Sequence, residues 1–194
     1  MATRLITAAT VEPLTLDEAK THLRVDITDD DALIIAYIKA AREHVETTEL
    51  SGALITQTWE LVLDAFPGNV FPLPLPPLQS VTSITYTDED DVDVVYSAAN
   101  YRVDAASFPG RVVLKSGSSW PSVTLKEVGG VVIRFVAGYG LAVSVPEPIK
   151  QATKLIIGDL YENRENTLVA QGVTIQTIPM SARYLLNSYR YKRF

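Results

Sequence analysis

The sequence predicts an α+β protein, in which both chain ends form a helical domain and an antiparallel β-sandwich or barrel-like domain is inserted between them. Apolar residues recur at intervals of three and four near both ends of the chain, and at intervals of two in its middle. Turn sequences such as "FPGN", "DEDD" and "KSGSS" separate the alternating segments. We therefore expect helices in residues 1–54, a β domain in residues 55–137, and helices with a basic-aromatic tail in residues 138–194.

Two helices are expected in the first part of the chain. Thr15 and Glu18 have the capping-box spacing, in which each side chain satisfies the other residue's free backbone N–H, and they predict a helix over residues 16–23. The aspartates at 29–31 suit the positive end of a second helix. Its apolar stripe comprises Leu33, Ile34, Tyr37, Ile38, Ala41 and Val45, and its expected solvent face carries Lys39, Arg42, Glu43 and Glu46.

The segments with a period of two define the strands of the β domain. They are "TWELVLD", "VTSITYT", "VDVVY" and "VVIRFV", with "YRVD" and "RVVL" as shorter candidates. Between the first two lies "FPLPLPPLQ", whose four prolines lack backbone donors and restrict the segment to an edge strand or extended coil. We expect Leu73, Leu75 and Leu78 to cap the sandwich. A PxxP ligand for an SH3-type groove is the rival interpretation, but no arginine flanks the motif.

A third helix is expected after Pro146 and Pro148, because proline suits the first helical turn. A strand-like segment at residues 173–178 and a short helix at residues 181–186 follow it. A helix that is apolar on two sides contacts two neighbours, and we expect one neighbour of the third helix to be another subunit. The stripe of this helix contains Ile149, Ala152, Ile156 and Leu160, and Leu155, Ile157 and Tyr161 widen it.

Composition excludes several functions. The 194-residue chain has 17 basic and 23 acidic residues and a net charge of −6, so it offers no broad basic surface for sequence-specific DNA binding. It contains no cysteine, which excludes thiolate catalysis and cysteine-rich zinc sites. It has neither a secretion signal nor an uninterrupted apolar run of membrane-helix length, so we expect a cytoplasmic origin and no membrane partner.

Motifs for enzymatic chemistry are missing from the sequence. Gly138 and Gly140 follow a strand, but the proline-rich "SVPEP" stands where a dinucleotide-binding loop needs a helix, so both glycines indicate a turn. His22 and His44 lie on separate expected helices and are interpreted as residues at the edge of an apolar face. We expect no catalytic residue, no metal site and no cofactor.

The β domain contains the residue types that two other functions, calcium binding and carbohydrate binding or hydrolysis, would use. Asp88, Asp90 and Asp93 resemble part of a calcium loop, but Asp93 occupies the position that requires glycine, so a solvated turn is expected instead. A carbohydrate-binding or hydrolytic module is the alternative, in which Trp59 and Trp120 would stack on sugars and an acid such as Glu127 would serve catalysis. Most such aromatic residues form sandwich cores, and no paired-carboxylate spacing is present.

The C-terminal segment "SARYLLNSYRYKRF" differs from the rest of this acidic chain. Its basic residues are interrupted by aromatic residues and by no acid, and arginine with aromatic residues is typical of interface anchors. A frayed terminus with incidental charge is the alternative. The candidate docking residues are Arg183, Tyr184, Tyr189, Arg190, Tyr191, Lys192, Arg193 and Phe194.

The order of several blocks resembles the head-tail connector proteins of tailed bacteriophages and prophages, also called adaptor or head-completion proteins. These blocks include "PLTLDEAKTHLRVD", "QTWELVLDAFP", "LPLPPLQSVTSITYTDED", "YRVDAASFPGRVVL", "VVIRFVAGYG", "VPEPIKQATKLIIGDLYENRE" and "IPMSARYLLNSYR". The similarity extends from about Leu14 to Arg190. Asp91 departs from the pattern where a turn glycine is common, and Asn187 with Ser188 replaces a usual proline.

The resemblance implies a non-enzymatic structural protein of the virion neck that assembles in the bacterial host cytoplasm. Such proteins form a closed ring, commonly twelvefold, below the portal protein, and extend the channel through which DNA passes without sequence-specific binding. They also offer a platform for a stopper or tail-terminator protein, and their C-terminal segment often reaches the portal. A tail-completion or stopper protein is the alternative within phage assembly. The expected ring interface comprises Leu155, Ile157, Tyr161, Val173, Ile175 and Ile178.

Overall fold

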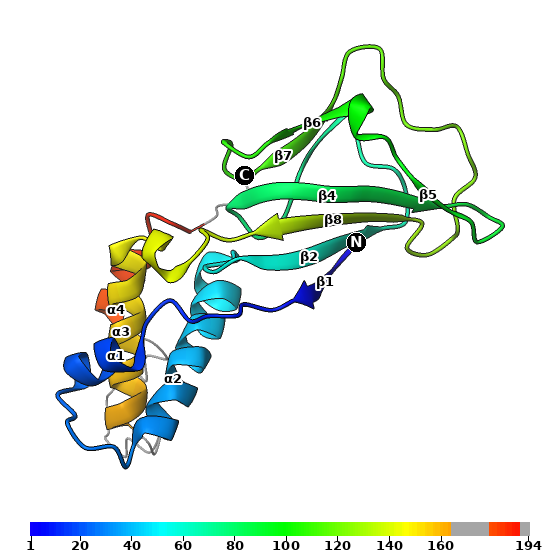
Figure 1. Cartoon of the computed structure of the whole chain (residues 1–194). Helices are drawn as coiled ribbons and strands as arrows, with labels where there is room; N and C mark the ends of the chain where they lie inside the picture. The colour runs from blue at the N-terminus through cyan, green and yellow to red at the C-terminus, as the bar shows by residue number, and fades with distance from the viewer. Residues whose placement is uncertain (164–178, 191–194) are drawn as a thin grey trace, which may run out of the picture. The chain divides into compact units, whose positions relative to one another are not determined.

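The computed structural model describes residues 1–163 and 179–190, and the chain divides into two compact units. A β unit consists of Met1–Thr10 and Ile55–Tyr139, and a helical unit consists of Val11–Leu54 and the chain from Gly140 onward. Figure 1 shows the strands and helices of each unit. Residues 1–10 were expected in the helical domain, and this expectation is wrong because they contain a strand of the β unit. The mixed α+β class with antiparallel sheets is confirmed.

The larger sheet of the β unit has five antiparallel strands in the order β1-β2-β8-β4-β5. The strand that was not expected, β1, pairs along the outer edge of β2. Its sequence, ATRLIT, is short, and every residue in it is exposed, so it lacks the half-buried pattern typical of a sheet strand. The strands are β1 (Ala2–Thr7), β2 (Gln57–Leu63), β4 (Leu78–Thr87), β5 (Asp93–Val95) and β8 (Val131–Ala137).

An ion-pair row holds β1 on this sheet. Arg4, Glu60 and Arg134 face one another across β1, β2 and β8, and both arginines donate hydrogen bonds to the Glu60 carboxylate. The Glu60 side chain is only 3% exposed. Its burial acts to raise the pKa, but the hydrogen bonds from Arg4 and Arg134 outweigh burial and lower the pKa of Glu60 below its ordinary value. Cross-strand pairing of this kind therefore fixes the register of an otherwise exposed strand.

The smaller sheet has three antiparallel strands in the order β3-β7-β6, namely β3 (Val70–Pro72), β7 (Arg111–Leu114) and β6 (Tyr101–Asp104). A 3₁₀ turn, η2 (Ala98–Asn100), precedes β6. The proline-rich segment begins in β3, which is an edge strand as expected, and Leu73 and Leu78 are buried. Leu75 is half-buried and has a positive φ of 60°. Within the described residues the strands form two separate sheets rather than one closed barrel.

Both sheets contribute to an apolar core. In β8, Val131, Ile133 and Phe135 are fully buried, whereas the alternate residue Arg134 is exposed. An aromatic cluster joins the sheets: the ring of Trp120 stacks on Phe66 at 5.2 Å between centroids, and it lies 6.1 Å from Phe71 of β3. Phe66 in turn meets Tyr86 of β4 edge to face at 5.5 Å, so aromatic contacts run from one sheet to the other.

The acidic turn between β4 and β5 is closed by its own side chains. The Asp88 carboxylate accepts hydrogen bonds from the backbone N–H groups of Asp90 and Val92, which is the usual role of aspartate in a turn. Asp91 has a positive φ of 60°, a conformation that favours glycine and that aspartate tolerates. Its carboxylate also accepts a hydrogen bond from Lys126 at 2.9 Å. The substitution of aspartate for the common glycine therefore preserves the turn.

The helical unit contains α1 (Leu16–Leu23), α2 (Asp31–His44), the π-helix η1 (Val45–Leu50), the 3₁₀ turn η3 (Ala142–Ser144), α3 (Glu147–Glu162) and α4 (Met180–Leu186). The capping box of Thr15 and Glu18 is present, which confirms the expected start of α1. Helix α3 contacts α1, α2 and α4, so it lies at the centre of the unit. No helix among residues 1–163 and 179–190 combines the length and the apolar character that crossing a bilayer requires.

Candidate functional site

The basic-aromatic segment begins in α4, which is anchored by its small and aliphatic residues. Pro179 precedes the helix and has the restricted φ of proline, −53°. Ala182 and Leu186 are buried and lie four residues apart, so they share the face that packs on α3 and η1. Beyond α4, the backbone N–H of Tyr189 donates to the Leu186 carbonyl at 2.9 Å and closes a turn. The segment is therefore folded as far as Arg190.

Two of the predicted docking arginines meet at one buried carboxylate. The Nη2 atom of Arg183 lies 3.7 Å from Oε1 of Glu49, and the Nη2 atom of Arg190 lies 3.5 Å from Oε2 of the same residue. Arg190 Nε also donates a hydrogen bond of 2.9 Å to the Glu49 backbone carbonyl. The Glu49 side chain is 3% exposed, whereas those of Arg183 and Arg190 are 57% and 43% exposed. The carboxylate is thus a fixed point on η1, to which the C-terminal segment is attached.

Glu49 belongs to a π-helix that buries a second glutamate as well. The hydrogen bonds of a π-helix join residue i to residue i+5, and such turns are rare and are frequently found at functional sites. In η1 the buried residues are Val45, Glu46, Glu49 and Leu50. The two acidic side chains have different partners, because Glu46 accepts hydrogen bonds from Arg42 at 2.7 Å and from the Leu54 N–H at 2.8 Å.

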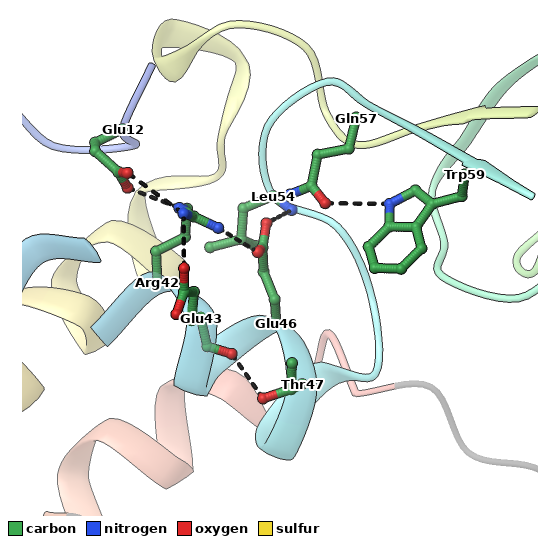
Figure 2. A network of polar contacts seen from close by, with 8 residues as sticks. All are labelled: Glu12, Arg42, Glu43, Glu46, Thr47, Leu54, Gln57 and Trp59. Carbon is green, nitrogen blue, oxygen red and sulfur yellow. Dashed lines mark hydrogen bonds and ion pairs between the residues drawn. The ribbon is translucent and has the colours of Figure 1, made fainter. Parts of the chain in front are cut away.

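Arg42 links η1 to the segment that precedes α1 (Figure 2). Its Nε donates to Glu12 Oε2 at 2.7 Å, its Nη1 donates to Glu46, and its Nη2 lies 3.5 Å from Glu43. Burial of the guanidinium acts to lower its pKa, but the hydrogen bonds to Glu12 and the charge of Glu46 outweigh burial and raise the pKa of Arg42. Arg42 and Glu46 were expected on the solvent face of α2, and this expectation is wrong because they satisfy each other's charge inside the unit.

The remaining predicted docking residues divide into described and undescribed positions. Tyr184 lies on the outer side of α4 and is 81% exposed, and Tyr189 is half-buried. Tyr191, Lys192, Arg193 and Phe194 lie outside the described residues. The structure therefore brings Arg183 and Arg190 together at Glu49, and it leaves Tyr184 as the large aromatic surface residue of α4.

The predicted ring-interface residues of α3 lie mostly against the helical unit's own helices. Ile157 is fully buried, and Leu155 is partly exposed. The Tyr161 hydroxyl donates a hydrogen bond of 2.6 Å to Asp30. The wide apolar face of α3 packs within the helical unit, because α1, α2 and α4 all contact this helix. Val173, Ile175 and Ile178 lie outside the described residues.

Residues considered for other chemistry have structural roles where they are described. Trp120 belongs to the aromatic cluster of the β unit, and Trp59 Nε1 donates to Gln57 at 3.1 Å. Burial, followed by the charge of Lys154, lowers the pKa of His22, which is half-buried on α1. In the part of the chain that the structure describes, no three histidine or carboxylate residues are grouped closely enough to hold a metal ion.

Sequence reasoning missed Glu49, although a signal for it exists. The apolar stripe of α2 ends at Val45, and Glu49 stands four residues later, where a continued stripe would place another apolar residue. A charged residue at such a position predicts a buried ion pair. Glu60 gives no such signal, because it alternates with Trp59 and Leu61 and shares its face of the strand with Thr58 and Val62.

The fold defines a small α+β protein with a β unit and a helical unit, whose C-terminal segment is folded against the helical unit. The chain belongs to the head completion protein family, whose model matches residues 12–192. This confirms the resemblance to head-tail connector and head-completion proteins that the sequence blocks indicated. No curated protein matches the chain.

Solved structures of gene transfer agent (GTA) particles contain similar chains. A chain in the neck of an empty GTA particle, computed with C6 symmetry, is 28% identical with a TM-score of 0.80. A chain in the virion of a native GTA particle is 25% identical with a TM-score of 0.79, and one in the neck of a native particle, computed with C12 symmetry, is 25% identical with a TM-score of 0.76. Each match covers 100% of this chain and 97% of the other chain.

Proposed function

We propose that this protein is a structural, non-enzymatic component of the neck of a tailed phage, prophage or related particle. The observation that carries the proposal is the match over the whole chain to proteins of GTA necks, together with membership of the head completion family. A match that spans both units supports a shared role for the entire molecule rather than for one module. In this role the protein completes the head vertex and provides a platform for a stopper or tail-terminator protein.

The protein assembles in this proposal as a closed homo-oligomeric ring of twelve copies. The C6 and C12 symmetries of the related neck structures support a ring, since twelve subunits satisfy both. A ring requires two different complementary patches on each subunit, and closure leaves neither patch free. The partly exposed Leu155 on α3 and the segment with Val173, Ile175 and Ile178 are the proposed contacts between neighbours.

DNA passes through the ring without sequence-specific binding. The chain carries a net charge of −6, and twelve copies of an acidic subunit repel phosphate rather than hold it. Tight binding would stall a DNA molecule in transit, so an acidic channel fits a conduit. The ring extends the channel of the portal protein in this account.

The C-terminal segment docks on the portal. Tyr184 and the arginines of this segment have the composition of interface anchors, and Tyr184 is largely exposed on a folded helix. An arginine that already has an acidic partner still offers free N–H groups, because a guanidinium has five donors. The folded segment therefore presents both an aromatic ring and oriented donors to a partner.

Deleting residues 189–194 tests the docking role. We expect the truncated protein to lose co-sedimentation with portal rings while its circular dichroism spectrum stays native-like, because the deletion removes anchors and leaves every described helix and strand in the chain. The matched control is the triple variant Arg24→Gln, Lys39→Gln, Arg102→Gln, which removes the same number of positive charges from exposed positions elsewhere. Undiminished co-sedimentation of the truncated protein would refute the docking role. Loss of binding in the control as well would show that net charge, rather than the segment, governs the interaction.

A further inference from the structure

The C-terminal segment is attached to η1 by ion pairs between one buried acid and two partly exposed bases, unlike an ordinary surface ion pair. The acid is buried and the two bases are partly exposed, so the carboxylate depends on the arginines more than the arginines depend on it. A carboxylate removed from water without a partner is costly, whereas an arginine at the surface keeps its hydration. Glu49 therefore favours conformations in which Arg183 and Arg190 remain on η1.

Arg190 also satisfies the end of η1 itself. The last carbonyl groups of a helix have no partner within the helix, and they carry partial negative charge. The Glu49 carbonyl belongs to this last turn, and it accepts the Arg190 Nε–H at 2.9 Å. Arg190 thus binds the Glu49 side chain and caps the helix at the same residue.

The spacing of the two arginines lets one carboxylate hold both sides of the segment. Arg183 lies inside α4 and Arg190 follows the turn that the Tyr189 N–H closes on Leu186. The two side chains return to the same residue from either side of this turn. Contacts at both ends fix the direction of the segment, which a single ion pair does not do.

We propose that Glu49 is the positioning residue of the C-terminal segment: its buried carboxylate and its own carbonyl hold Arg183 and Arg190, and so place α4 and the turn after it for docking. The docking part of this inference rests on the proposed function, whereas the holding part does not. Glu49 acts through the arginines and need not touch the portal.

The variant Glu49→Gln tests the holding part, since it keeps the size of the side chain and removes its charge. We expect cleavage by trypsin after Arg183 and Arg190, followed by intact mass, to become about tenfold faster, because cleavage requires local release of the segment. The control is Glu43→Gln, an exposed acid that lies 3.5 Å from Arg42 and whose loss leaves Arg42 its other partners. An unchanged cleavage rate in Glu49→Gln, or an equal increase in the control, would overturn the proposal.

Measuring portal affinity distinguishes a residue that positions the C-terminal segment for docking from one that only stabilises the folded segment. We expect Glu49→Gln to weaken portal binding about tenfold, and to have no further effect in a chain that already carries Arg183→Gln and Arg190→Gln, since coupled residues are not additive. Faster cleavage with unchanged portal affinity would leave Glu49 a stabilising residue and refute positioning. If the unaltered protein binds no portal, the proposed function fails, and the cleavage assay still decides whether Glu49 holds the segment.

Discussion

At the scale of single residues, the turn by which the chain leaves the β unit requires glycine at position 138. Its φ is +116°, and a Cβ atom there would stand inside van der Waals distance of the Ile55 carbonyl. Positive φ and close backbone approach are the two conditions that require glycine. The sequence predicted a turn at Gly138 and Gly140, and both have positive φ after β8.

The variant Gly138→Ala is expected to lower the free energy of unfolding by about 3 kcal/mol, the sum of backbone strain and overpacking. Urea denaturation measures this change. Gly117→Ala is the matched control, because Gly117 has a φ of +81° and nothing within 4 Å of the added carbon, so it incurs strain alone. Equal losses in the two variants would show that the Ile55 carbonyl yields and that close approach has no role.

At the scale of elements, the junction of α2 and η1 is held by buried charges. Arg42 satisfies Glu12 and Glu46, and Glu46 also accepts the Leu54 N–H. The segments before α1 and after η1 are thereby joined to one helix end. A buried pair of this kind adds modest net stability, but breaking it leaves a charge without a partner.

The variant Arg42→Met is expected to destabilise the protein by about 3 to 5 kcal/mol, because it leaves two carboxylates without their guanidinium. Chemical denaturation of Arg42→Met and Glu43→Gln compares a buried and an exposed member of the same network. We expect Glu43→Gln to change stability by less than about 0.5 kcal/mol. A loss below about 1 kcal/mol in Arg42→Met would contradict the structural role given to this network.

Elements with local signals were predictable from the sequence, and elements defined by distant partners were not. The capping box of Thr15 and Glu18 located α1, because its contacts join residues three positions apart. Strand β1 was not predicted, because its Arg4 pairs with Glu60, which lies far along the chain. The burial of Arg42 was missed for the same reason, since an arginine on a helix face gives no local sign of its partner.

At the scale of the whole molecule, the order of sequence blocks carried more information than any single motif. It indicated the head-completion family, which the family match confirms. The candidate site was predictable only in part: composition marked the C-terminal segment, but Glu49, which holds Arg183 and Arg190, lies in a π-helix that the sequence did not predict. Ile157 of α3, which was expected between subunits, is fully buried within the helical unit, whereas Leu155 of the same helix is partly exposed.

The central claim is that copies of this protein close into a ring on the portal. Electron microscopy of the purified protein mixed with portal rings tests it most directly, with native mass spectrometry of the same sample to count subunits. The account predicts a second ring stacked on the portal with twelve copies of this chain. A protein that stays monomeric and leaves the portal bare under these conditions would contradict it.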